Sequence, residues 1–197
     1  MSKYRFILLD WDGNLAKTLD IWLEACRIPL ENRGLKLTDE EIASSFGAFP
    51  QYIKQWGLTD VDTILSEADA IGMKKIPNVE LYPDAIEVLE GLRSAGKKLA
   101  LITTSSRDNI KHLLDKYNMA SYFQAIVTRD DTTHRKPHPE PLEKAIELLG
   151  GNKTEAVMIG DSDKDLGAAK NAGIDSILFY PKEHEKFYNI VELKKHD

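Results

Sequence analysis

The sequence predicts an α/β fold in which helices cover both faces of a parallel β-sheet and a helical segment is inserted after the first strand. Short apolar runs, typical of strands buried on both faces, alternate with segments whose apolar residues recur at helical spacing. A long stretch after the first run contains helical patterns but no convincing strand pattern. The predicted strands are residues 5–9, 98–102, 125–128, 156–159 and 176–179.

Apolar residues at positions i, i+3, i+4 and i+7 mark one face of each helix expected between the later strands. Gly96 and Gly173 follow helical patterns and are typical of helix C-termini. Ligands of parallel α/β sheets bind beyond the carboxyl ends of the strands, so a functional site is expected among the residues that follow each strand. The two clearest helix faces are Ile110, Leu113, Leu114 and Tyr117, and Leu142, Ala145, Ile146 and Leu149.

Residues 16–80 are expected to form the helical insertion, and residues 1–15 with 81–197 the sheet domain. Thr38 and Glu41 predict a capping box, because the hydroxyl and the carboxylate can each pair with a backbone N–H group. An insertion at this point would stand at the carboxyl end of the first strand, where it could act as a lid. Its other helix faces are Leu19, Trp22, Leu23 and Cys26, and Ile64, Ala68 and Ile71.

The segment Phe46–Pro50 interrupts the helical patterns of the insertion and has two interpretations. Gly47 allows close approach of the backbone, and Phe46 and Phe49 could line a pocket that reads the substrate. Alternatively, the segment is an ordinary turn between helices, and both phenylalanines lie in the core of the insertion.

The composition, with 42% hydrophobic and 29% charged residues, is that of an ordinary globular protein. The net charge of −6 argues against a nucleic-acid partner, because no basic field would attract a phosphate backbone. The apolar run before Asp10 is too short for a signal peptide or a membrane span. The single cysteine, Cys26, cannot form an internal disulfide, which favours the reducing cytoplasm. Cys26 is expected to be a small buried apolar side chain. The sequence carries no signal for an oligomeric state.

Two aspartates, Asp10 and Asp12, follow the first predicted strand. Residues two apart in an extended chain point to the same side, so both carboxylates can face one site while Trp11 points toward the core. At about 4 Å and an effective dielectric constant near 20, their repulsion is roughly 4 kcal/mol. A shared proton or a bound cation would remove it. The alternative is a solvated acidic turn, which is common for an isolated pair.

Polar residues also follow the later strands. Thr103 ends the second strand, and a hydroxyl followed by backbone N–H groups at a helix start suits phosphate oxygens. Lys136 precedes a helix, and Asp161 follows the fourth strand, with Asp165 four residues later. Each has a structural alternative: a helix N-cap, a surface charge, or an acid favoured by a helix dipole. Their shared place at strand ends favours one common site.

Taken together, these segments resemble the haloacid dehalogenase superfamily, most of whose members are phosphatases, and in particular its capped phosphoglycolate phosphatases. The motifs follow the family's order along the chain. The resemblance implies a Rossmann-like core with a helical cap domain inserted after the first motif, in agreement with the insertion above. The matching segments are Asp10-Trp11-Asp12-Gly13, Thr103, Lys136-Pro137, and Gly160-Asp161 with Asp165 nearby.

The resemblance also implies roles for these residues. Asp10 would attack phosphorus and form an aspartyl-phosphate, and Asp12 would protonate the leaving oxygen and later deprotonate water. Thr103 and the Thr104 N–H group would bind the phosphoryl group, and Lys136 would neutralise its charge. The implied activity is hydrolysis of small phosphate monoesters.

The cofactor implied by the resemblance is Mg²⁺. A carboxylate oxygen of Asp10, the backbone carbonyl of Asp12 and the carboxylate of Asp161 would bind it, since oxygen ligands suit this ion. Asp165 would lie in its first or second coordination shell.

The chain departs from the family pattern at two positions. Asn14 stands where threonine is usual, which alters one polar contact of the loop, and Lys17 stands where many relatives carry an acid. Neither change removes a group that the chemistry requires.

Each rival function would require different residues at particular positions of the chain. A dehalogenase would not need the acid at Asp12. A sugar-phosphate mutase tends to have glutamate where Gly160 stands, which favours hydrolysis here. A phospho-accepting receiver module would place its aspartate after the third strand, where Asp130 and Asp131 follow an arginine, and it lacks a large insertion. A non-catalytic binding protein would not need the complete set of acids and lysine.

The expected partner is a small phosphorylated metabolite such as phosphoglycolate or a sugar phosphate, ahead of nucleotides and pyrophosphate.

Overall fold

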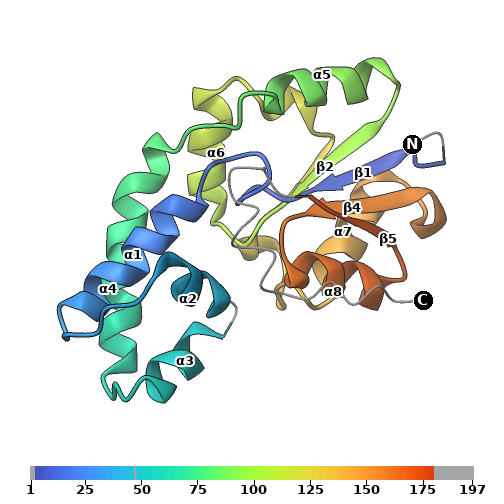
Figure 1. Cartoon of the computed structure of the whole chain (residues 1–197). Helices are drawn as coiled ribbons and strands as arrows, with labels where there is room; N and C mark the ends of the chain where they lie inside the picture. Colours follow the sequence, from blue (N-terminus) through green and yellow to red (C-terminus); the bar gives the residue numbers. More distant parts are fainter. Residues whose placement is uncertain (1–2, 47, 180–197) are drawn as a thin grey trace. The chain divides into compact units, whose positions relative to one another are not determined.

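Five parallel strands form one sheet in the computed structural model, which describes residues 3–46 and 48–179 (Figure 1). Each strand boundary lies within one residue of the boundary predicted from the apolar runs. The predicted α/β fold is therefore confirmed, and the order across the sheet is β3-β2-β1-β4-β5. The strands are β1 (Phe6–Leu9), β2 (Lys98–Ile102), β3 (Ala125–Val127), β4 (Ala156–Gly160) and β5 (Asp175–Leu178).

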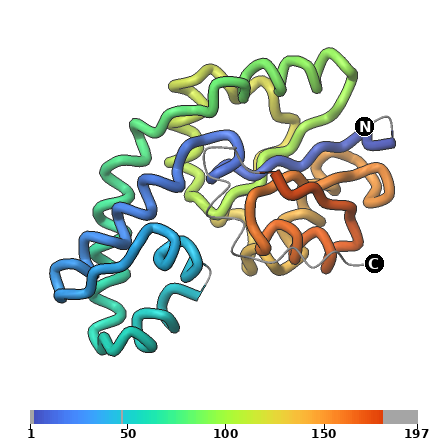
Figure 2. The backbone as a smooth tube through the Cα atoms, in the orientation of Figure 1, coloured from blue at the N-terminus to red at the C-terminus, as the bar shows by residue number. Residues whose placement is uncertain are grey.

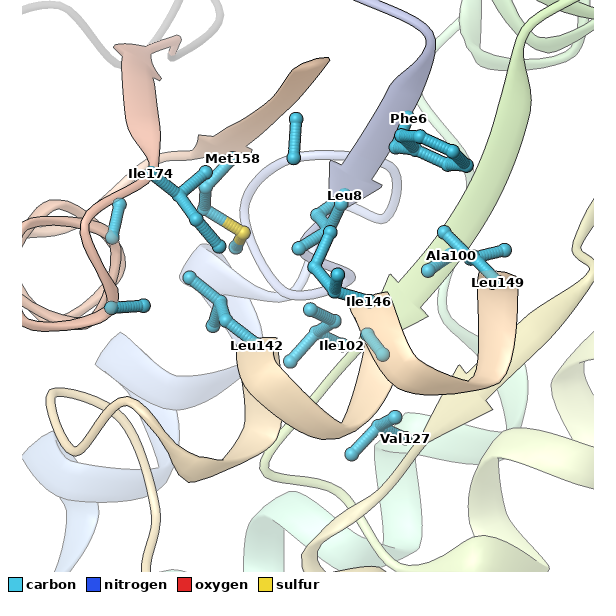
Figure 3. Close-up of a cluster of buried hydrophobic side chains, with 14 of the residues drawn as sticks. Phe6, Leu8, Ala100, Ile102, Val127, Leu142, Ile146, Leu149, Met158 and Ile174 are labelled. Carbon is cyan, nitrogen blue, oxygen red and sulfur yellow. The ribbon is translucent and has the colours of Figure 1, made fainter. Parts of the chain in front are cut away.

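Helices α7 (Glu140–Leu149) and α8 (Asp163–Ala172) pack against one face of this sheet. Figure 3 shows strand residues such as Leu8 and Met158 meeting Leu142 and Ile146 of α7 in a buried apolar cluster. Because successive strand side chains alternate between faces, Ile7 points to the opposite face, where α5 (Ala85–Ser94) covers β2 (Figure 1). The other helical elements described between residues 80 and 179 are α6 (Arg107–Lys116) and the 3₁₀ turns η2 (Ala120–Tyr122), η3 (Arg129–Asp131) and η4 (Lys153–Glu155).

The edge strand β5 departs from the predicted two-sided coverage. β1 is buried along its whole length, whereas Ile177 of β5 is 38% exposed and Phe179, just after it, is 51% exposed. An edge strand has a neighbour on one side only, and α8 packs on one face of it. Among the residues that the structure describes, the predicted coverage on both faces does not extend to this edge.

The order of the strands reverses between β1 and β4. From β1 the chain moves outward to β2 and β3, then returns to place β4 on the other side of β1. Leu9 pairs with Ile159, and the Asp10 N–H group donates to the Ile159 carbonyl over 3.0 Å. The residues that follow β1 and β4 consequently lie side by side at the point where α/β sheets bind ligands.

Residues 18–79 fold as a separate helical unit, and residues 3–17 with 80–179 form the unit that contains the sheet. The insertion predicted after the first strand is therefore present. The exact boundaries predicted from the sequence stay a prediction, and residues 180–197 of the predicted sheet domain lie outside the described residues. The helices of the insertion are α1 (Leu19–Glu31), α2 (Asp39–Ser44), α3 (Phe49–Gln55) and α4 (Val61–Lys75), followed by the 3₁₀ turn η1 (Ile76–Asn78).

The predicted helix signals of the insertion are confirmed. The Thr38 N–H group donates to the Glu41 carboxylate over 2.7 Å, and the Glu41 N–H group donates to the Thr38 hydroxyl, which completes the capping box that begins α2. Figure 2 shows α1 and α4 side by side, as their contacts require. A Cβ atom at Gly72 would lie 2.6 Å from the Trp22 ring, so only glycine permits this approach. The apolar core consists of Leu19, Leu23, Cys26, Leu30, Ile42, Phe49, Ile53, Ile64 and Ala68.

The two phenylalanines of Phe46–Pro50 differ in their surroundings within this unit. Phe49 is buried in the helical core and packs edge-on against Trp56, with ring centroids 6.2 Å apart. Phe46 is 38% exposed, and Gly47 lies outside the described residues. Phe49 thus belongs to the core, and a role of Phe46 toward the substrate stays a prediction. Cys26 is buried as expected, and burial raises the pKa of its thiol to about 12.

Candidate active site

The Lys136 ammonium lies between two buried carboxylates at the carboxyl end of the sheet. Its Nζ donates to Oδ1 of Asp10 over 2.7 Å and to Oδ1 of Asp165 over 2.5 Å, and it also donates to the Ile102 carbonyl. The lysine side chain is 4% exposed, so this is a desolvated ion-pair network and not a surface charge. The interpretation of Lys136 as a solvated surface residue is therefore excluded.

The strand ends bring together the acids that the sequence predicted. Asp10 follows β1, Asp161 follows β4, and Asp165 lies in the first turn of α8. Each of the three offers a carboxylate oxygen, and these oxygens all lie within 4.8 Å of one another. This group of acids is one that could hold a cation.

Gly160, the last residue of β4, makes this close approach possible. A Cβ atom there would lie 2.3 Å from Cγ of Asp165, well inside van der Waals contact. The first turn of α8 can therefore reach the sheet only because residue 160 has no side chain.

Thr103 and Asp12 meet on the other side of β1. The Thr103 hydroxyl lies 3.4 Å from Oδ2 of Asp12 and accepts the Ser105 N–H group over 3.0 Å. Thr103 is buried, and Asp12 is partly exposed. The helix N-cap predicted near this position is Ser106, so the Thr103 hydroxyl is not used as a cap. The side chain of Thr104 is exposed, and a role for its N–H group stays a prediction.

Electrostatics make this cluster receptive to a cation. Burial raises the pKa of the Asp10 carboxyl well above its ordinary value; the neighbouring carboxylates of Asp165, Asp161 and Asp12 add to the shift, and Lys136 opposes it. Burial alone would lower the pKa of the Lys136 ammonium, but Asp10 and Asp165 more than offset this and hold its pKa above the usual value. Three further carboxylates and one ammonium act on Asp10, so the negative charges outnumber the positive charge when all are ionised.

One residue, Ser162, contacts the site without having been predicted. Ser162 donates to Oδ2 of Asp165 through its hydroxyl, over 2.6 Å, and through its N–H group, over 3.2 Å, so both oxygens of Asp165 are engaged. The Ser-x-x-Asp spacing at 162–165 is a capping-box signal that could have revealed this contact. Asn14, which the sequence marks as a departure from the family pattern, is buried, and its Nδ2 atom has no hydrogen-bond partner among the described residues.

Trp11 is buried as the strand alternation predicted, and Lys17 has an aromatic neighbour. The indole of Trp11 is 1% exposed. The Lys17 ammonium lies 5.8 Å from the centroid of the Tyr82 ring, within the range of a cation–π contact. Lys17 therefore contacts a residue of the unit that contains the sheet, to which it also belongs.

Comparison with known proteins identifies relatives of this chain. The PpaX pyrophosphatase of Bacillus cereus is 40% identical over 95 residues, which are 48% of this chain and 44% of that protein. The chain thus spans less than half the length of this curated relative.

No helix in the described part of the chain is long and apolar enough to cross a membrane.

Two crystal structures have the same fold over most of the chain. A candidate phosphoglycolate phosphatase from Lactobacillus plantarum superposes with a TM-score of 0.75 at 25% identity, covering 88% of this chain and 84% of that chain. A candidate haloacid dehalogenase-like hydrolase from Bacteroides fragilis has a TM-score of 0.75 at 27% identity, covering 95% and 93% of the two chains. The family model of haloacid dehalogenase-like hydrolases matches residues 7–179, from β1 to the residue after β5. The resemblance read from the motifs is thereby confirmed, and the chain belongs to the haloacid dehalogenase-like hydrolase family.

Proposed function

We propose that this protein is a Mg²⁺-dependent phosphatase that hydrolyses small phosphate monoesters through an aspartyl-phosphate on Asp10. The observation that carries the proposal is the contact of Lys136 with Asp10, over 2.7 Å, inside a buried cluster of acids at the switch point of the sheet. A lysine beside a buried carboxylate supplies positive charge where a phosphoryl group would bring more negative charge.

Asp10 is the proposed nucleophile. Its Oδ1 accepts from Lys136, so Oδ2 is the oxygen that would form a bond to phosphorus while the bond to the leaving oxygen breaks. Lys136 stays within reach of the phosphoryl oxygens, and the Thr103 hydroxyl stands beside the neighbouring acid. Catalysis would then come mainly from positioning and from the fixed charges of the site.

Asp12 is the proposed proton carrier. Its carboxylate is partly exposed and lies beside the Thr103 hydroxyl, apart from the Asp10, Asp161 and Asp165 oxygens that gather within 4.8 Å. Asp12 would protonate the leaving oxygen in the first step. It would then remove a proton from the water that cleaves the acyl-phosphate.

The donor set of the cluster fits Mg²⁺. Carboxylate oxygens of Asp10 and Asp161 and the backbone carbonyl of Asp12 would bind the ion, and hard oxygen ligands are those it prefers. Asp165, whose two oxygens already accept hydrogen bonds, would orient Lys136 and Ser162 beside the ion. When bound, the ion would supply positive charge to the phosphoryl oxygens.

Hydrolysis is favoured over the two rivals by particular contacts. A glutamate at position 160, which is usual in the mutases, would collide with Asp165, so the first turn of α8 would have to move. At the end of β3, Asp131 accepts from the Thr128 hydroxyl and Asp130 accepts from the Arg107 N–H group. These acids serve as local caps, which argues against a receiver module with its phosphorylation site there.

The comparisons with known proteins favour two classes of substrate. The structural neighbour from Lactobacillus plantarum favours small organic phosphates such as phosphoglycolate. The relationship to PpaX over 95 residues favours inorganic pyrophosphate as the second candidate. Both present a terminal phosphoryl group to the same cluster, and they differ in the group that leaves.

A phosphatase screen tests this proposal. Purified protein is incubated with phosphoglycolate, sugar phosphates, nucleotides and pyrophosphate, and released phosphate is measured with Mg²⁺ or with excess EDTA. We expect turnover of at least one small phosphate ester or of pyrophosphate, and a loss of at least about 100-fold with EDTA. Equal turnover under both conditions would contradict the metal requirement, and no turnover of any substrate class would contradict the function.

The raised pKa of Asp10 gives a pH dependence for Mg²⁺ binding. Without metal, the folded protein holds a proton on this carboxyl that the unfolded chain releases, so stability falls as pH rises through the window above the ordinary carboxyl pKa. Mg²⁺ competes with that proton. The increase in melting temperature on adding Mg²⁺ is therefore expected to be larger at pH 7.5 than at pH 5, measured by calorimetry. Asp161→Asn is the control and should lose most of the increase; an increase that is equal at both pH values would refute the coupling.

A further inference from the structure

The loop that delivers Lys136 carries a second group of ligating side chains. His134 and His138 stand two residues before and two residues after Lys136, and Glu140 begins α7. Lys136 is buried, while His134 and His138 are exposed and Glu140 is partly exposed. The same short loop thus presents its lysine to the acidic cluster and its two imidazoles to solvent.

The two imidazole rings stack and meet one carboxylate oxygen. Their centroids are 4.2 Å apart with an interplanar angle of 23°. Nδ1 of His134 lies 2.9 Å from Oε2 of Glu140, and Nδ1 of His138 lies 4.0 Å from the same oxygen. One ligand atom from each of the three residues falls within 4.8 Å of the others.

The two distances to Oε2 of Glu140 bracket the edge length of a tetrahedral metal site. With bonds of about 2.05 Å, ligand atoms around Zn²⁺ are about 3.3 Å apart, which lies between the two distances to Oε2. Moving the His134 nitrogen outward by about 0.4 Å and the His138 nitrogen inward by about 0.7 Å would equalise the two distances to Oε2. A carboxylate and two imidazoles leave the fourth position for water.

The carboxylate of Glu140 is already fixed in place. Its Oε1 accepts the Thr133 N–H group and its Oε2 accepts the His134 N–H group, each over 2.9 Å. These backbone hydrogen bonds, with that of the His134 ring, lower the pKa of Glu140 to about 2, so the carboxylate is ionised at neutral pH. Carboxylates that bind metals are commonly held by hydrogen bonds in this way.

The loop itself is anchored from the other side by α8. The Asn171 side chain donates to the Pro137 carbonyl over 3.0 Å, and a Cβ atom at Gly167 would lie 2.9 Å from Cβ of Pro137. The backbone between the two histidines is thus held by the protein, and ion binding would need only side-chain adjustments.

We propose that His134, His138 and Glu140 bind a borderline divalent cation of the Zn²⁺ type, at a site that shares no ligand with the acidic cluster. Imidazole suits Zn²⁺, Ni²⁺, Co²⁺ and Cu²⁺ but not Mg²⁺, so the two sites would select different ions. Binding moves the proton of His134 from Nδ1 to Nε2, and it replaces the 3.3 Å contact between the Glu140 N–H group and Nδ1 of His138. The ion would join both ends of the loop that carries Lys136.

The test is Zn²⁺ titration by calorimetry of full-length metal-free protein in buffer with excess Mg²⁺, which competes for the acidic cluster. The variants are His134→Ala, His138→Ala and the double variant. His112→Ala, on the exposed part of α6, is the matched control, and Asp161→Asn tests the acidic cluster. Circular dichroism and melting curves of each variant establish that it is folded.

We expect one Zn²⁺ equivalent whose dissociation constant rises at least about tenfold in each single variant and which is lost in the double variant. His112→Ala and Asp161→Asn should keep it. With Co²⁺ as the probe, the intense visible bands of a four-coordinate ion should appear in the parent and vanish in the double variant. Zn²⁺ binding that survives the double variant, that disappears in Asp161→Asn, or that is absent in the parent overturns the proposal, and the cluster then only pins the loop by hydrogen bonds.

Discussion

Replacing Asp10 with asparagine is expected to lower Mg²⁺-dependent phosphate release by at least about 10³-fold, because the amide cannot form the acyl-phosphate. The loss should be in kcat for every phosphorylated substrate that the screen identifies. Initial rates with the best substrate measure it, in the same buffer for both proteins.

The same substitution is expected to leave the metal-free protein at least as stable as the parent. Burial and three neighbouring acids disfavour the ionised form of Asp10, and a neutral amide of the same shape removes that repulsion while its oxygen still accepts from Lys136. Urea denaturation without metal is the measurement. Full activity in this variant would exclude Asp10 as the nucleophile, and a large loss of stability would show that the activity loss reflects unfolding.

Replacing Lys136 with methionine is expected to destabilise the protein by about 3–5 kcal/mol, because it leaves Asp10 and Asp165 buried without their shared cation. Phosphatase activity should fall by at least about 100-fold, since the positive charge beside the phosphoryl group is lost. Urea denaturation and initial rates measure the two effects separately.

Two controls make the lysine result specific. Lys170→Met, on the exposed side of α8, removes the same charge at the surface and should change stability by no more than about 0.5 kcal/mol. Mg²⁺ should recover part of the stability of Lys136→Met, because a cation can again neutralise the acids. A Lys136→Met protein as stable as the Lys170→Met protein would contradict the buried ion-pair network.

The strands and the acidic residues could be predicted from the sequence because their signals are local. Four apolar residues followed by Asp10 predict a buried strand with an acid at its end. This prediction does not require knowledge of the neighbouring strands. The family motifs then linked Asp10 to Lys136 and Asp161 across more than 120 residues. The structure indeed places Lys136 in contact with Asp10, and a carboxylate oxygen of Asp161 within 4.8 Å of one of Asp10.

Contacts that depend on how elements approach one another could not be predicted. The need for glycine at position 160 follows from the distance between α8 and β4, and the pairing of Lys136 with Asp165 follows from how the loop lies on α8. The stacking of His134 on His138 depends on the path of the loop, which no periodicity encodes. The exposure of β5 was missed because an apolar run does not reveal that its strand lies at an edge.

The pairing of β1 with β4 has a consequence for how the protein is made. Ile7 lies beside Val157, a partner synthesised 150 residues later, so the first strand spends most of translation without its second neighbour. Contacts of such sequence separation form slowly, since a long loop must close before they contribute. Asp10 and Asp161 can meet only after this pairing. The appearance of catalytic activity would therefore report a late stage of folding, and a chain arrested on the ribosome before β4 would contain Asp10, the proposed nucleophile, but not Asp161.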